Sequence, residues 1–304
     1  MMRYLFILCC FSALLSCDKV ENPIQEQATN EVDSLLYPND WSSYPWPTFE
    51  NNTNTNRNIL IEDYTGHTCV FCPAAADIAH ELAGNNPNRV FVASIHASPG
   101  GLGEFQLVEE PVFVHDFTTP EGLQYGETYE SGFGFLGNPR GNISRITFNG
   151  TMFQKASQWE QKTNEALSAN LLQVNLQAKA NYYETTRGLF VHTEIDPMLV
   201  SPADINLVAY FIQDTFVAPQ KRQQNGVTET VMDYVHHDVH RGNLDGFAFG
   251  RTLNSTYLKD NGLYQVDMSY RIPDEYDPKN CHVLIYAMNR ESYEIYQVIK
   301  VDIP

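Results

Sequence analysis

The most regular hydrophobic pattern in the chain lies between residues 58 and 96. The apolar residues 59–61 run into a polar turn at residues 65–68, which predicts a short buried strand. Residues 73–84 then place alanine, isoleucine and leucine on one helical face, with a proline in the first turn and a glycine at the end. Residues 89–94 read RVFVAS and predict a second strand. This order predicts a right-handed βαβ unit if the two strands are parallel.

Three further segments complete a first domain, which we expect to cover residues 57–170. Residues 96–131 form an insertion whose helix is expected to begin with Thr119 as its cap and Pro120 next. This insertion either shapes a substrate surface or simply covers the sheet. A strand is expected at residues 143–148, and the helical period of residues 153–169 predicts the helix that closes the domain.

The pattern changes at about residue 171, where apolar and polar residues begin to alternate with a period of two. The alternating runs predict strands at residues 172–178, 189–195, 205–212, 264–270, 282–288 and 293–301. Turn residues separate these runs, and no convincing helix lies between them. We therefore expect residues 171–304 to form an antiparallel, immunoglobulin-like β-sandwich of about seven strands.

The N-terminal region has neither pattern. Residues 18–56 contain four prolines and end in NNTNTN, which is typical of a tether. The aromatic residues of this tether either dock a ligand or pack it onto the domain that follows: Trp41, Tyr44, Trp46 and Phe49. Residues 4–16 are apolar but too few to span a bilayer comfortably, which indicates a signal peptide.

The end of this signal, Leu14-Leu15-Ser16-Cys17, is similar to a bacterial lipoprotein signal. The similarity implies that residues 1–17 are a signal peptide ending at a lipidated Cys17, which would anchor the mature chain to a membrane. The alternative is an ordinary secretory signal in which the cysteine occurs by chance. In either case the folded body lies outside the cytoplasm, where disulfides persist.

Charge and cysteine content narrow the function further. The formal net charge is -18, and an acidic surface repels phosphate backbones, so we expect no nucleic-acid partner. Three of the six cysteines lie in residues 1–17, which leaves Cys69, Cys72 and Cys281 in the mature body. An odd number this small excludes a scaffold stapled by disulfides.

Cys69 and Cys72 carry the strongest candidate chemistry. Cysteines with this spacing at a helix N-terminus allow three interpretations, namely a redox-active dithiol, half of a zinc site, or a static disulfide. Zinc needs four ligands and no second closely spaced pair exists, while a bridge this short restrains little of the unfolded chain. The redox interpretation is therefore favoured. In it Cys69, the more exposed sulfur, attacks a substrate disulfide as a thiolate, and Cys72 resolves the mixed disulfide.

The sequence around these cysteines resembles the thioredoxin superfamily. The segment ILIEDY resembles that family's central strand, and Asp63 stands six residues before Cys69, where the family has a buried proton-handling aspartate. Residues 132–139, GFGFLGNP, resemble the family's approach to a cis-proline that faces the disulfide. The resemblance implies an α/β thioredoxin-like fold for the first domain, a proton relay through Asp63 and a contact of Pro139 with the substrate backbone.

Nearly the whole mature chain also resembles one narrower family, the thioredoxin-like lipoproteins related to a 28-kilodalton outer membrane protein of gut and oral anaerobes. The similarity rests on the lipidation cysteine, on EDYTGHTCVFCPAA at residues 62–75, on the GNP segment and on YVHHDVHR at residues 234–241. The resemblance implies an outer membrane lipoprotein that faces the periplasm or the cell surface.

Two functions remain open at this point. In the first, the protein exchanges thiols and disulfides with envelope proteins and needs no cofactor besides the redox-active Cys69–Cys72 pair. In the second, it is not an enzyme: the β-sandwich binds an unknown surface ligand, and the thioredoxin-like domain is a scaffold. The second function is favoured by Val70-Phe71, which replace the usual glycine-proline pair, and by the large C-terminal domain.

The other candidate residues give weaker indications of function. His236, His237 and His240 would bind a metal only from one helix face, but they fall in an expected strand and turn, so no metal site is predicted. Cys281 is expected to be a small buried apolar residue. His67 either stabilises the Cys69 thiolate by its charge or is an ordinary turn histidine exposed to water.

Overall fold

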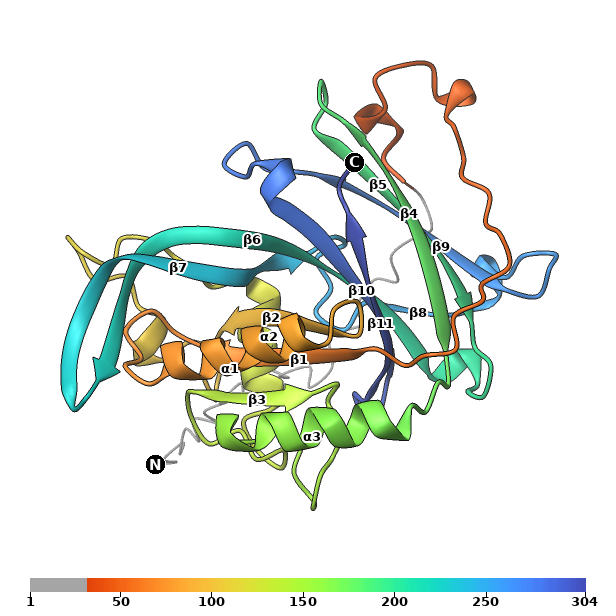
Figure 1. The fold of residues 1–304 in the computed structure, drawn as a ribbon. Coiled ribbons are helices and arrows are strands. Elements are labelled where there is room, and N and C mark those ends of the chain that lie inside the picture. Colours follow the sequence, from red (N-terminus) through yellow and green to blue (C-terminus); the bar gives the residue numbers. More distant parts are fainter. Residues whose placement is uncertain (1–31) are drawn as a thin grey trace, which may run out of the picture.

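The computed structural model describes residues 32–304, so the predicted signal peptide and the lipidation site at Cys17 lie outside the described residues. The fold is mixed α/β and mostly β, with two sheets and few helices (Figure 1). The α-helices are α1 Cys72–Asn85, α2 Pro120–Thr128 and α3 Ala156–Ala169. The strands are β1 Ile59–Thr65, β2 Val90–His96, β3 Arg140–Ile143, β4 Asn175–Tyr183, β5 Gly188–Asp196, β6 Ile205–Gln224, β7 Val227–Asn243, β8 Arg251–Thr252, β9 Tyr264–Arg271, β10 Cys281–Asn289 and β11 Ile295–Asp302.

The larger sheet joins strands from both halves of the chain. Its order is β11-β10-β6-β7-β2-β1-β3, with β8 paired to β6. β1 is parallel to β2 and antiparallel to β3, so the expected strand, helix and parallel strand are present. The two halves meet where Ser94 of β2 pairs with Val239 of β7. The smaller sheet has the order β4-β5-β9.

The central strand β1 is buried on both of its faces. Because side chains alternate along a strand, residues 59, 61 and 63 point to one face and residues 60, 62 and 64 to the other. Ile59 and Ile61 pack under α1 and α3. Leu60 and Tyr64 pack toward α2, β6 and β10. This alternation sends the two acidic residues of β1, Glu62 and Asp63, into different surroundings.

The C-terminal half forms two facing layers of strands. Apolar residues of β4, β5 and β9 pack against those of β6 and β10 in one continuous core, as the period-two pattern predicts. Cys281 is a free, buried thiol in this core. Within residues 32–304, no helix is both long and apolar enough to cross a membrane.

The hairpin of β6 and β7 extends well beyond this core. In Figure 1 it curves away from the sheet and passes the end of α1 where that helix begins. The sequence predicts only the first part of β6, because residues 205–212 are buried and apolar. The remainder of the strand is largely polar and half-buried or exposed, so it has no apolar period to reveal it.

Two element boundaries differ from those expected in the first half. The strand expected at residues 143–148 ends at Ile143, because Ser144 and Arg145 adopt left-handed backbone angles, with φ of 48° and 53°. The helix expected from residue 153 begins at Ala156. The backbone N–H of Phe153 instead bonds to the carbonyl of Phe133, at 2.9 Å.

Most of the described part of the predicted tether, residues 32–56, packs onto the second half of the chain. Tyr37 and Tyr44 are buried against Phe190 of β5, with Trp41 beside them. The Tyr44 hydroxyl bonds to His192 Nε2 at 2.7 Å, which fixes the segment to the smaller sheet. Aromatic residues therefore pack the segment, as one of the two expectations had it, and they do so against the second half of the chain.

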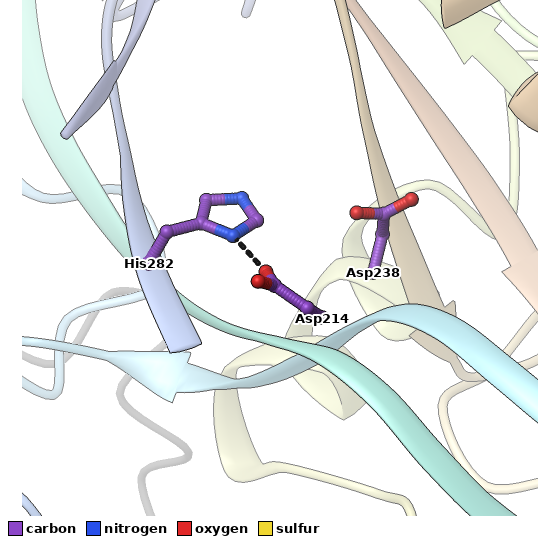
Figure 2. A group of neighbouring side chains, drawn as sticks. All are labelled: Asp214, Asp238 and His282. Carbon is purple, nitrogen blue, oxygen red and sulfur yellow. Dashed lines mark hydrogen bonds and ion pairs between the residues drawn. The ribbon is translucent and has the colours of Figure 1, made fainter. Parts of the chain in front are cut away.

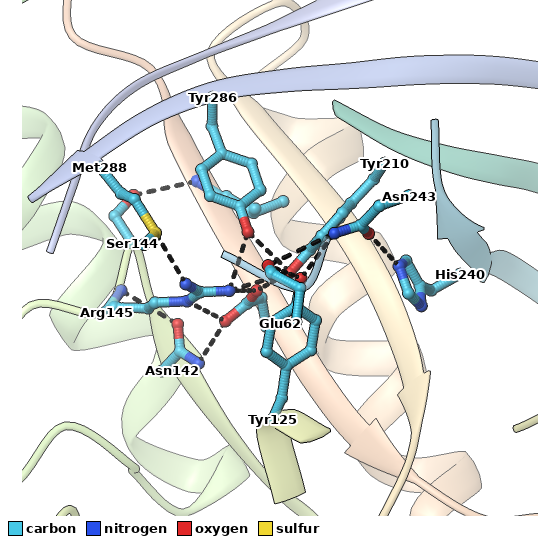
Figure 3. Close-up of polar contacts among 12 residues, drawn as sticks. Glu62, Tyr125, Asn142, Ser144, Arg145, Tyr210, His240, Asn243, Tyr286 and Met288 are labelled. Carbon is cyan, nitrogen blue, oxygen red and sulfur yellow. Dashed lines mark hydrogen bonds and ion pairs between the residues drawn. The ribbon is translucent and has the colours of Figure 1, made fainter. Parts of the chain in front are cut away.

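A buried ion pair connects the two halves at their junction. Arg145 donates to both carboxylate oxygens of Glu62, at 2.7 and 2.9 Å, and both side chains are fully buried (Figure 3). Tyr210 of β6 donates to Glu62 Oε1 at 2.7 Å, and Tyr286 of β10 accepts from Arg145 at 2.9 Å. Glu62 and Arg145 are each hydrogen-bonded to residues of both halves, so the network fixes how the halves are joined.

Candidate functional site

Cys69 and Cys72 form a disulfide between the end of β1 and the start of α1. Cys72 is the first residue of α1, and Pro73 occupies the first turn, where a helix tolerates it. Cys69 is 2% exposed and Cys72 is 1% exposed. Both cysteines are therefore buried, and the expected difference in exposure between Cys69 and Cys72 is very small, because other parts of the chain cover the turn.

One cover is the outer part of the β6–β7 hairpin. Gln220 donates its side-chain amide to the carbonyls of Gly66 and Cys69, at 3.2 and 3.1 Å. The backbone N–H of Lys221 bonds to His67 O at 2.8 Å, and that of Gln223 bonds to Val70 O at 2.9 Å. The outer part of the hairpin thus lies along the disulfide turn and is held there by main-chain hydrogen bonds.

The other cover is the insertion after β2. The N–H of Thr68 bonds to Phe105 O at 3.2 Å, and a Cβ on Gly66 would lie 2.5 Å from the same oxygen, so this contact requires glycine. His67 is 1% exposed, and its Nε2 lies 2.8 Å from Leu107 O. The expectation that His67 is a turn histidine exposed to water is therefore wrong. Burial lowers the pKa of His67, which favours a neutral ring without a charge to stabilise a thiolate.

Asp63 lies on the same face of β1 as the disulfide and is fully buried. Neither of its carboxylate oxygens has a hydrogen-bond partner among the described residues. Burial without a partner disfavours the charged form and raises the pKa of Asp63 to about 8. At neutral pH this side chain is therefore mainly a protonated acid that is able to give up its proton.

Asp63 and Cys72 both line a small cavity of about 90 Å³. Two buried histidines line it as well, His96 from β2 and His236 from β7. Neither ring nitrogen of His96, and not Nε2 of His236, has a partner among the described residues. Burial lowers the pKa of both rings, that of His236 to about 4, so these two rings are neutral at neutral pH.

Pro139 stands at the start of β3, and the peptide bond between Asn138 and Pro139 is cis. Because Arg140 pairs with Tyr64, Pro139 lies one residue beyond the last pair of β1 and β3, at the end of β1 where the disulfide turn begins. Asn138 is held in place by a bond from its side-chain amide to Ala97 O, at 2.8 Å.

The histidines singled out in the sequence do not converge on one point. His236 is buried in the cavity beside Phe117, and His237 is exposed and stacks on His80 of α1 with ring centroids 4.7 Å apart. His240 is buried and bonds to Thr119 and to Asn243, at 3.1 and 3.0 Å. Gln220 and His96, which the sequence pattern does not single out, line the same cavity as Cys72, whereas His240 does not.

The fold and the site together define a class, namely a mostly β, mixed α/β protein with a buried C-x-x-C disulfide between a central strand and the following helix. A family model described as "Outer membrane protein Omp28" matches residues 126–304. The chain belongs to the Omp28 family, so the predicted outer membrane location is confirmed. A comparison with curated proteins finds no match.

Two solved structures are similar to parts of the chain, and the first of them resembles it in fold. HBP35 of Porphyromonas gingivalis has a TM-score of 0.60 at 14% identity, with 83% of this chain and 77% of that chain covered. A domain of the outer membrane lipoprotein Omp28 from Porphyromonas gingivalis has a TM-score of 0.30 at 16% identity, with 44% of this chain and 89% of that chain covered.

Proposed function

We propose that this outer membrane protein exchanges thiols and disulfides with envelope proteins through Cys69 and Cys72, on a thioredoxin-like domain that precedes an immunoglobulin-like one. The strand order supports the fold proposal: β1 is parallel to β2, antiparallel to β3, and joined to α1 through the disulfide turn. The position of Pro139 beside the end of β1 agrees with the role that the thioredoxin resemblance implies.

The observation that carries the proposal is the unpartnered, protonated Asp63 in the cavity that Cys72 also lines. In the disulfide form, a substrate thiolate would attack Sγ of Cys69 and break the Cys69–Cys72 bond. Sγ of Cys72 would leave as a thiolate, and Asp63 is the buried acid placed to supply its proton. The second substrate thiolate then attacks the substrate sulfur of the mixed disulfide. Two electrons pass to the protein, and a dithiol and a substrate disulfide result.

Access to Cys69 requires the hairpin to move. The hydrogen bonds of Gln220, Lys221 and Gln223 hold the hairpin on the turn, and an extended substrate would take the same main-chain positions. Phe71, inside the motif, is 58% exposed and offers an apolar contact to such a substrate. The hairpin thus acts as an internal competitor that limits which thiols reach the disulfide.

Trapping experiments test the proposal. The Cys72→Ser variant should accumulate a mixed disulfide with a dithiol peptide that is supplied in its disulfide form, because the resolving thiol is missing. The Cys69→Ser variant should accumulate none, and the Cys281→Ser variant, which changes the remaining buried thiol, should behave as the parent protein. Equal trapping by the Cys69→Ser and Cys72→Ser variants would contradict the assigned roles.

The same burial of both sulfurs also favours a second candidate function. In it the disulfide stays closed and the protein binds a surface ligand through its β-rich half, with the first half as a scaffold. The two functions differ in one property, since only the exchange function requires Cys69 to react while the protein remains folded.

A further inference from the structure

Two aspartates face each other across the base of the β6–β7 hairpin. Gln213 pairs with Val239 and Thr215 pairs with His237, which leaves Asp214 and Asp238 opposite one another between these pairs. Like charges directly across an antiparallel pair destabilise a sheet. A site that keeps two carboxylates in this position needs a positive partner.

His282 of β10 completes the group from the other side of β6. Its Nδ1 is hydrogen-bonded to Asp214 Oδ1, and its side chain is 5% exposed. One potential ligand atom from each of the three residues lies within 4.8 Å of the other two. Figure 2 shows the Asp238 carboxylate directed toward the space beside the His282 ring and the Asp214 carboxylate.

The Asp238 carboxylate has no ion-pair partner of its own among the described residues, whereas Asp214 is paired with His282. No described residue donates a hydrogen bond to the Asp238 carboxylate, which has a potential ligand atom within 4.8 Å of those on Asp214 and His282. Lys300, which lines the same hollow, has its Nζ 3.4 Å from Asp302 Oδ1. Asp238 and His282 open onto a hollow of about 170 Å³, which leaves room for water beside a bound ion.

We propose that Asp214, Asp238 and His282 bind one divalent cation of the zinc class. Two carboxylate oxygens and one imidazole nitrogen are a ligand set that zinc accepts, and three protein ligands leave a position for water on the side of the hollow. The ligands come from three neighbouring strands, so the ion would fasten the base of the hairpin to β10. Asp238 also lines the cavity that Cys72 lines, but neither cysteine is among the proposed ligands.

Calorimetric titration of the untagged mature protein with Zn²⁺ tests the proposal. The disulfide is kept closed, so that Cys69 and Cys72 cannot bind the metal as thiolates. We expect one Zn²⁺ per chain in the parent protein. The Asp238→Asn and Asp214→Asn variants should bind at least about 10- to 100-fold more weakly, the loss seen even for outer-sphere partners of a metal. The exposed Asp233→Asn variant on the same strand should bind as the parent does.

Thermal unfolding gives an independent readout. Zn²⁺ should raise the melting temperature of the parent protein and leave that of the Asp238→Asn variant unchanged, because an ion stabilises only the fold that binds it. Without metal, that variant should melt no lower than the parent, since it removes one of two facing charges. Absence of stoichiometric binding, or full binding by the Asp238→Asn variant, would overturn the proposal. So would loss of binding in a His80→Gln variant alone, which would place the ion at the His80–His237 pair.

Discussion

Replacing Asp63 with asparagine tests directly whether burial raises the pKa of this side chain. The substitution keeps the shape of the side chain but removes the group that titrates. In the parent protein the folded state holds the Asp63 proton more tightly than the unfolded state, because burial raises the pKa from 3.8 to about 8. The unfolded chain therefore gains stability relative to the folded one as the pH rises through this range.

The expected change in the free energy of unfolding follows from the pKa shift of Asp63. At about 1.4 kcal/mol per pKa unit, burial of Asp63 costs about 6 kcal/mol once the pH is well above 8. Most of this loss falls between about pH 5 and about pH 9, where it amounts to about 4 kcal/mol. The Asp63→Asn variant lacks this contribution, so its stability should fall by about 4 kcal/mol less over the same interval.

Urea unfolding at a series of pH values measures the difference, with the free energy of unfolding extrapolated to water at each pH. Other titrating groups affect both proteins alike and cancel in the comparison. The Asp77→Asn variant is a matched control, because Asp77 is an exposed aspartate of α1 beside the same cavity. Parallel stability curves for the parent and the Asp63→Asn variant would refute the reasoning.

Two further substitutions test the cover and the junction. Gln220→Ala removes two hydrogen bonds to the disulfide turn, worth about 1 kcal/mol each, and should speed alkylation of reduced Cys69 about 5- to 30-fold, whereas the exposed Gln224→Ala should not. Arg145→Met leaves the buried charge of Glu62 without its partner. It should lower the free energy of unfolding, measured with urea, by about 3 to 5 kcal/mol. The double variant with Glu62→Gln should recover part of this loss, and no recovery would contradict the pairing.

Local patterns in the sequence were enough to predict the elements around the disulfide. The apolar run of β1, the proline in the first turn of α1 and the apolar middle of β2 each act within a few residues, so they predict a strand, a helix and a strand in the observed order. Thr119 caps α2 as expected, and its side chain accepts from the Gly122 N–H.

The features that decide access to the disulfide depend on distant residues. Gln220 contacts Cys69 across 151 positions, and the polar outer half of β6 has no apolar period to reveal it. Likewise, Asp214 and Asp238 face each other only because of the register of a long hairpin. Hydrophobic patterns predict which residues are buried, but they do not predict which polar residues meet.

Arg145 is another polar residue whose contacts the hydrophobic pattern does not predict. The sequence predicts Arg145 within a strand at residues 143–148. The strand instead ends at Ile143, and a left-handed backbone directs Arg145 into the core, where it pairs with Glu62 on the opposite face of β1 from Asp63. The buried charge of Arg145 has its partners only when both halves of the chain are assembled around it.

Titration of the folded protein in defined glutathione buffers tests the central proposal most directly. The fraction of Cys69–Cys72 disulfide is read at each ratio by alkylation and mass, with the Cys281→Ser variant as the parent so that one thiol pair is counted. The exchange function predicts a reversible two-electron transition within the accessible range of glutathione ratios. A pair that stays fully oxidised under strong reductant, while the protein remains folded, would contradict it.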